Sequence, residues 1–149
     1  MIQIKAVDAQ NILDVCKLTA NQNRVGTTME EYLRCNAISI AEAKYDPEMH
    51  PNAIYNNNAL IGFFMYQREE DQADTVTICR FMIDYQFQQK GLEEKALAHI
   101  LKGLKIQGVK KVILRIDAAN EIAKKQGLSF GFQFTGKTSN DESCYELNL

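Results

Sequence analysis

The spacing of hydrophobic residues along the chain predicts seven strands and four helices. Apolar residues that alternate with polar ones indicate half-buried strands, whereas apolar residues three and four positions apart indicate helices. From the N-terminus the predicted order is β-α-α-β-β-β-α-β-α-β-β. The predicted strands cover 2–6, 53–55, 59–67, 75–85, 112–116, 132–138 and 143–147, and the predicted helices cover 8–20, 28–46, 91–108 and 120–130.

Helix-capping residues place the starts of the first two helices. Asp8 is a good N-cap for the first, and Thr28 begins the second, with Glu31 three residues on as a capping box. The second helix is expected to end at Asp46-Pro47. The residues expected on the inner side of the first helix are Ile12, Leu13, Val15, Cys16 and Thr19.

Two segments bear on how the predicted strands are arranged. The charged run 68–74 reads as a solvated hairpin loop between two strands. The run 112–116 is nearly all apolar, which is typical of a central strand covered on both faces. Because strands and helices alternate only in part, we expect a mixed sheet flanked by helices rather than a doubly wound one.

Composition restricts the classes of protein that fit. The 149 residues suit a single domain, 1–149, and a net charge of −2 disfavours a general nucleic-acid binder. No apolar run approaches the ~20 residues that cross a bilayer. The N-terminal residues alternate in polarity, unlike a signal peptide, so a cytoplasmic location is expected, with no membrane partner.

Cysteine and histidine usage favours neither a disulfide framework nor a metal centre. The four cysteines are widely spaced and lack a C-x-x-C pair, and His50 and His99 are isolated. We therefore expect no metal site and small, buried, hydrophobic cysteines. These are Cys16, Cys35, Cys79 and Cys144.

The turn between the longest predicted strand and the helix after it has the features of an anion site. The first amides of a helix lack backbone partners and carry positive potential from the helix dipole, so they bind phosphate groups. Gly91 permits close approach of an anion to the backbone, and Lys90 adds a positive charge. A plain strand-to-helix turn would share these features. A Walker A loop is absent.

The order of motifs resembles that of the GCN5-related N-acetyltransferases (GNAT). The run Gln88-Gln89-Lys90-Gly91-Leu92-Glu93 is similar to the family's motif A, [Gln/Arg]-x-x-Gly-x-[Gly/Ala]. The run Asn120-Glu121-Ile122-Ala123, followed by Gly131-Phe132, resembles its Asn-x-x-Ala…Gly-Phe motif. Segments 53–66 and 80–84 are similar to the spermidine/spermine (diamine) acetyltransferase-like branch, so the resemblance covers about 1–149.

This resemblance implies a mixed, mostly antiparallel sheet with its fourth and fifth strands splayed apart, the acyl-CoA N-acyltransferase fold. Acetyl-CoA would donate an acetyl group directly to the primary amine of a small molecule. Its pantetheine would pair with the backbone of Met82 and Ile83, and Asn120 would contact the pantetheine or phosphate region. The residues implied to hold the pyrophosphate are Gln88, Gln89, Lys90, Gly91, Leu92 and Glu93.

Two positions depart from the family pattern. Glu93 stands where glycine or alanine is usual, and its carboxylate would repel a pyrophosphate unless it points outward. Gly127 stands where many relatives carry a tyrosine that protonates the departing thiolate. The catalytic residues therefore stay open, with Tyr85, Tyr145 or a water as alternative proton donors. A non-catalytic coenzyme A-binding or regulatory protein is the alternative function.

The acceptor is predicted only as a small amine. Carboxylates in or after the second predicted helix would suit a cationic polyamine, although a solvated acidic face is the simpler interpretation of each one. Self-association as a homodimer stays open. The carboxylates concerned are Glu30, Glu31, Glu42, Asp46 and Glu48.

Overall fold

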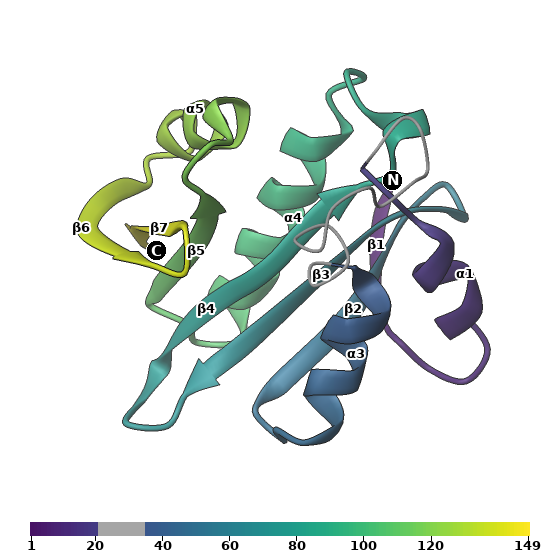
Figure 1. Ribbon diagram of the computed structural model, residues 1–149, viewed down its shortest axis with the longest axis horizontal. Helices are drawn as coiled ribbons and strands as arrows, with labels where there is room; N and C mark the ends of the chain where they lie inside the picture. Colours follow the sequence, from purple (N-terminus) through teal and green to yellow (C-terminus); the bar gives the residue numbers. More distant parts are fainter. Residues whose placement is uncertain (21–34) are drawn as a thin grey trace.

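A computed structural model of the chain describes residues 1–20 and 35–149, and these residues form one twisted sheet (Figure 1). The strand order is β1-β2-β3-β4-β5-β7-β6. Among the described strands only β4 and β5 pair in parallel, so the predicted mixed, mostly antiparallel sheet is confirmed. The strands are β1 (Ile2–Ala6), β2 (Met49–Asn56), β3 (Ala59–Glu69), β4 (Gln72–Ile83), β5 (Lys111–Asp117), β6 (Gln133–Ser139) and β7 (Glu142–Asn148).

The described helices lie on both faces of the sheet (Figure 1). They are α1 (Ile12–Lys17), α3 (Asn36–Lys44), α4 (Leu92–Ile106) and α5 (Glu121–Ser129), and a 3-10 turn covers Tyr85–Phe87. The apolar stripe of α4 packs with one face of the sheet in a cluster that includes Ile78, Leu114 and Phe132. On the opposite face, α1 and α3 cover a smaller cluster around Phe63 and Cys79. Among residues 1–20 and 35–149, no helix is long and apolar enough to cross a membrane.

The first predicted helix is shorter in the structure than in the prediction, which was wrong about its inner face. The Asp8 carboxylate accepts hydrogen bonds from the amides of Gln10 and Asn11 in a turn, and α1 begins only at Ile12. A helix of six residues presents little more than one side chain to the core. Val15 is fully buried, whereas Leu13 is 73% exposed and Cys16 is also exposed.

α3 begins at Asn36, after the extended N-cap residue Cys35, whereas the predicted start at Thr28 and the capping box with Glu31 lie outside the described residues. Its end at Lys44, just before Asp46-Pro47, agrees with the prediction.

The β3–β4 hairpin corrects the predicted charged loop at 68–74. β3 continues to Glu69 and β4 begins at Gln72, so the turn itself is only Glu70 and Asp71. Cross-strand pairing carries both strands past the point where hydrophobic alternation ends. At its other end β4 stops at Ile83, two residues before the predicted end.

The expectation that β5 is covered on both faces was also wrong. Its burial alternates, with Val112, Leu114 and Ile116 buried and the residues between them only partly so. The buried set faces α4 and α5, whereas α1 and α3 pack over β2, β3 and β4 on the other side. β5 therefore keeps a partly open face next to β4.

Cysteine burial likewise differs from the prediction. Only Cys79 is buried, Cys16 is exposed, and Cys35 and Cys144 are intermediate. Cys79 lies on the central strand β4, whereas the other three lie on α1, at the start of α3 and on β7, where coverage is thinner. All four are free thiols.

Candidate active site

β4 and β5 pair over only four residues and then separate. The last pair joins Ile78 to Leu114, although β4 continues to Ile83 and β5 to Asp117. On the other side of β4 the register with β3 shifts, so that Cys79 is an extra residue between the partners of Tyr66 and Met65. Such a bulge bends a strand and increases its twist. It therefore explains the splay of β4 from β5 that was predicted.

The unpaired end of β4 contains the residues predicted to meet the pantetheine. Met82 and Ile83 pair with Phe63 and Gly62 of β3, and the described residues include no strand along their other edge. The Ile83 carbonyl accepts a hydrogen bond of 3.0 Å from the Gln88 side chain. One of the predicted pyrophosphate residues thus fixes the turn to the end of β4.

The turn that follows brings the backbone to the first amides of α4. Asp84 caps the 3-10 turn by accepting from the Gln86 amide, and Gln89 then adopts a φ of +62°. Gly91 occupies the N-cap of α4 with φ +72°, a left-handed conformation that glycine adopts without a Cβ clash. Gly91 has no side chain with which to cap this helix end, so the amides after it can bind a ligand.

Both acidic and basic side chains lie around the start of α4. Leu92 is buried and anchors the first turn of α4 to the core, while Glu93 and Glu94 supply two carboxylates in that turn. Acidic side chains in the first turn of a helix interact favourably with the helix dipole. The Lys90 ammonium lies 5.9 Å from the centre of the Phe87 ring, outside the helix and next to its first amides.

Asn120 and Gly127 both have structural roles in α5. The Asn120 carbonyl oxygen accepts from the Ala123 amide at 3.0 Å as the N-cap, which leaves its amide nitrogen as the group able to reach a ligand. Gly127 is buried, and a Cβ there would lie 3.4 Å from Ile116 and 3.8 Å from Leu114. A small residue therefore lets α5 pack closely on β5.

The two candidate tyrosines lie on different sides of the opening. Tyr85 follows β4 in the turn, where its hydroxyl accepts from the Gln86 side chain. Tyr145 lies on β7 opposite Leu114, is only 7% exposed and contacts the Phe134 ring. The structure places Tyr145 beside the last β4–β5 pair and Tyr85 beyond the end of β4.

The face of the sheet opposite α4 carries charged groups where the strands separate. Arg115 is the first β5 residue after the last pair with β4, and Cys79 is the corresponding residue of β4. Burial raises the pKa of the Cys79 thiol, Arg115 offsets part of this effect, and the carboxylates of Glu142 and Glu42 add to it. Cys79 is therefore a neutral thiol near neutral pH. Arg115 was not predicted as a site residue, although it is the single charge within the apolar run 112–116.

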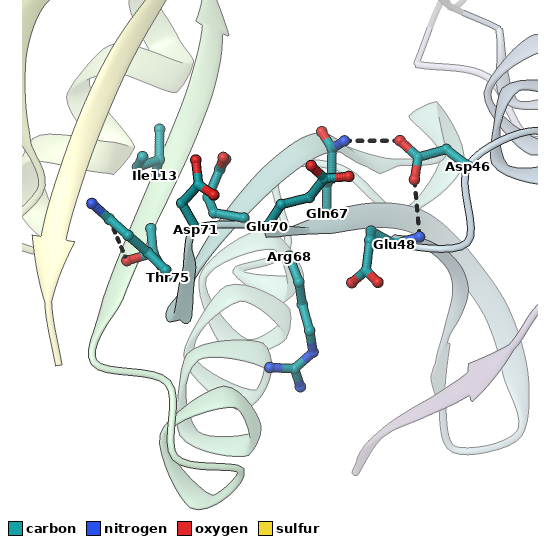
Figure 2. Close-up of a pocket in the computed structure, with 10 residues that line it drawn as sticks. Asp46, Glu48, Gln67, Arg68, Glu70, Asp71, Thr75 and Ile113 are labelled. Atoms are coloured by element: carbon teal, nitrogen blue, oxygen red, sulfur yellow. Dashed lines mark hydrogen bonds between the residues drawn. The ribbon is translucent and has the colours of Figure 1, made fainter.

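An acidic hollow of about 490 Å³ lies further along the same face (Figure 2). Five carboxylates line it against one cation, Arg68, whose side chain extends away from Glu70 and Asp71 and donates to Gln107 (Figure 2). The Asp46 carboxylate accepts from Gln67 at 2.9 Å and from the Glu48 amide at 2.9 Å. The lining residues are Asp46, Glu48, Gln67, Arg68, Glu69, Glu70, Asp71, Gln72, Thr75 and Ile113.

The hollow and the opening between the strands lie along the same face of the sheet. Glu69 accepts a 2.8 Å hydrogen bond from Thr77, which lies two residues before Cys79 on β4. Ile113 similarly lies two residues before Arg115 on β5, and such residues share a face about 6.6 Å apart. Of the predicted acceptor carboxylates, Asp46 and Glu48 line the hollow, Glu42 lies near Cys79, and Glu30 and Glu31 lie outside the described residues.

Comparison with known proteins agrees with this geometry. A model of the acetyltransferase (GNAT) family matches residues 12–132. A spermine/spermidine N(1)-acetyltransferase from Bacillus subtilis is 30% identical over 142 residues, which cover 91% of this chain and 90% of that protein. The separation of β4 from β5 and the helix start after Gly91 are features that the family resemblance led us to expect.

Solved structures share the fold over the whole chain. An acetyltransferase from Thermus thermophilus superposes with a TM-score of 0.77 at 17% identity, over 100% of this chain and 97% of that one. The PaiA N-acetyltransferase from Thermoplasma acidophilum, solved in complex with coenzyme A, gives 0.71 at 15% identity, over 100% and 99%. The chain belongs to the GNAT acetyltransferase family.

Proposed function

We propose that this protein transfers the acetyl group of acetyl-CoA to a primary amine of a small cationic molecule of the polyamine class. The observation that carries the proposal is the opening between β4 and β5 beside a helix start whose N-cap is a glycine. The relative from Bacillus subtilis, named for spermine and spermidine, supports the acceptor class. The acidic hollow on the same face supports it independently.

The donor would lie along β4 with its pyrophosphate at α4. The free edge of Met82 and Ile83 offers backbone groups to the pantetheine, although the Ile83 carbonyl already accepts from Gln88. The amides that follow Gly91, with the positive end of the helix dipole, suit the pyrophosphate. Lys90 adds a cation there, and the Asn120 amide nitrogen approaches from the start of α5.

The acceptor would approach from the opposite face. A primary amine at the opening meets the region of Cys79 and Arg115, and the chain of a polyamine can follow β4 and β5 into the hollow. Its remaining ammonium groups would then lie among carboxylates such as Glu48 and Glu70. Ammonium and carboxylate groups attract each other, most strongly where solvent is partly excluded. Charge complementarity thus selects an acceptor with more than one cation.

The transfer itself requires mainly that two reactants be held together. The neutral amine attacks the thioester carbon, the C–N bond forms, and the C–S bond breaks with its electron pair leaving on sulfur. Fixing both partners in reach of each other supplies much of the rate enhancement. Close packing of α5 on β5 accounts for Gly127, so this departure from the family pattern does not by itself favour coenzyme A binding without turnover.

The 149 residues would act as one acetyltransferase domain in the cytoplasm, on a small molecule rather than on nucleic acid or a membrane. A homodimer is compatible with this reaction, and the acyl group is taken to be acetyl.

An acceptor panel tests the proposed class. Acetyl-CoA-dependent thiol release is expected with spermidine and spermine at a lower KM than with a monoamine of equal chain length. In the triple variant Glu48→Gln, Glu70→Gln, Asp71→Asn, the KM for spermidine should rise about tenfold, on the scale of ~0.5 kcal/mol per carboxylate lost. The KM for the monoamine and for acetyl-CoA should stay the same.

A matched control removes one exposed carboxylate elsewhere. Asp14→Asn on α1 changes charge without touching the hollow, and the KM for spermidine should not respond to it. Thiol release equal to background with every amine, in protein that still binds coenzyme A, would show that the proposed reaction does not occur. Equal KM values in the triple variant and the wild type would remove the hollow from the acceptor site.

A further inference from the structure

Arg115 lies on β5 where β4 and β5 separate, next to the place proposed for acetyl transfer. Its neighbours Leu114 and Ile116 belong to the core under α4 and α5. By strand alternation its own side chain lies on the opposite face, where Cys79 belongs to the second cluster. The guanidinium therefore lies on the side from which the acceptor would approach.

The Arg115 Nε is buried, and no atom of the described residues meets hydrogen-bond geometry with it; the neutral Cys79 thiol beside the guanidinium is at most a weak acceptor. In the same part of the chain, neither ion pair within 4 Å involves Arg115. A buried donor without a partner is costly, and more so on a charged group, so native proteins rarely keep one without a reason. An acceptor atom that arrives with a ligand would supply the missing partner.

The groups around Arg115 keep it a cation near neutral pH. Burial opposes the charge, but Cys79, Glu142 and Cys144 outweigh it and raise the pKa of the guanidinium. Cys79 contributes as a thiolate only at high pH, because burial raises its own pKa. Glu142 of β7 and Glu42 of α3 are the carboxylates that act on this group of side chains. Arg115 thus stays a cation while the thiol beside it is neutral.

We propose that Arg115 is a catalytic residue that stabilises the negative charge developing on the thioester sulfur as the acetyl group leaves. The proposal rests on the acetyl transfer proposed above. As the C–S bond breaks, its electron pair goes to sulfur, and the Nε–H donates a hydrogen bond to the forming thiolate. Arginine cannot give up its proton at physiological pH, so the thiolate takes its proton from water afterwards. The proton of the attacking amine passes to a carboxylate or to solvent.

This assignment explains how Gly127 is compatible with turnover. A phenol on α5 would protonate the leaving thiolate, whereas a cation on β5 stabilises it as an ion pair. A nearby cation also lowers the pKa of the acceptor's ammonium group, which increases the fraction of neutral, nucleophilic amine. Both effects act on the same bond-forming step and need no proton transfer from the protein to sulfur.

The direct test measures coenzyme A alone, without any acceptor. In the wild-type complex, ultraviolet absorbance of the thiolate should show the pKa of the bound thiol lowered by about one unit or more relative to free coenzyme A. In Arg115→Gln this shift should vanish while the Kd for coenzyme A changes little. An unshifted thiol pKa in the wild-type complex would overturn the assignment, whatever amines the enzyme accepts.

Kinetics provide a second readout with the acceptors that the wild type uses. Arg115→Gln should lower kcat about 10²- to 10³-fold at an unchanged KM for acetyl-CoA. Arg115→Lys should keep part of kcat and lose it at alkaline pH as the lysine deprotonates, a descending limb that the wild type lacks. Millimolar guanidinium should partly restore Arg115→Ala. Lys137→Gln, which removes an exposed cation from β6, serves as the control.

Two other results would contradict the proposal. If Arg115→Gln lowers only the melting temperature and leaves kcat per folded enzyme unchanged, the arginine is structural. If it raises KM only for acceptors that carry a carboxylate, Arg115 binds an anionic group of the acceptor. Absence of thiol release by the wild type with all amines would instead count against the proposed function, and the thiol pKa would still decide the role of Arg115.

Discussion

Replacing Gly91 with valine is expected to weaken coenzyme A binding about 30-fold. Gly91 has φ +72°, and a β-branched residue in the left-handed region costs ~2 kcal/mol, which corresponds to that loss if the strain is relieved by rotating the peptide. Rotation turns the first amides of α4 away from the pyrophosphate. A Cβ at Gly91 would touch nothing within 4 Å, so the change acts through the backbone alone.

Isothermal titration calorimetry with coenzyme A measures this effect, and Gly103→Val is the matched control. Gly103 lies within α4, also has open space where a Cβ would lie, and does not have a positive φ. Valine there should leave the Kd unchanged and slightly stabilise the helix. A folded Gly91→Val protein with the wild-type Kd would show that the amides at the start of α4 do not hold the ligand.

Replacing Gly62 with alanine is expected to lower the free energy of unfolding by about 3 kcal/mol, a large effect for one methyl group. The new Cβ would lie 2.4 Å from the Met82 carbonyl oxygen and 2.8 Å from a terminal carbon of Ile83. The first of these is backbone, so β3 and β4 must move apart. For a chain of this size the melting temperature should fall by roughly 6–12 °C.

The same substitution should also raise the KM for acetyl-CoA, because the displaced residues are those that would pair with the pantetheine. Thermal unfolding and steady-state kinetics measure the two effects separately. Gly103→Ala makes the same chemical change in an open position of α4 and should stabilise the protein by ~0.5–1 kcal/mol. An unaltered melting temperature for Gly62→Ala would mean that the two strands are not in the close register described.

Local patterns were sufficient to predict the unit that is proposed to bind the donor. The strand, the turn and the helix at 75–108 were predicted because α4 keeps its apolar residues on one face and Gly91 marks its start. The end of α5 at Gly131, with φ +95°, followed from the same kind of local signal. Splaying of β4 from β5 was expected only from family resemblance, since a bulge at Cys79 has no clear mark in one sequence.

Features that depend on tertiary coverage were not predictable from the sequence. Whether the open face of β5 is covered depends on where α1 and α3 pack, and the apolar run 112–116 suggested full burial. The hollow was not predicted because its carboxylates come from segments 46–48 and 67–72, which read separately as a helix end and a solvated loop. Arg115 was not predicted because a single charge in an apolar strand is commonly a structural one.

A crystal structure of the complex with coenzyme A tests the central claim most directly. We expect the pyrophosphate within hydrogen-bonding distance of the amides that follow Gly91, and the pantetheine in the opening between β4 and β5 with its sulfur near Cys79 and Arg115. Two results would contradict the claim. One is coenzyme A bound elsewhere on the protein, and the other is a pyrophosphate site that Glu93 or Gln88 still blocks at saturating ligand.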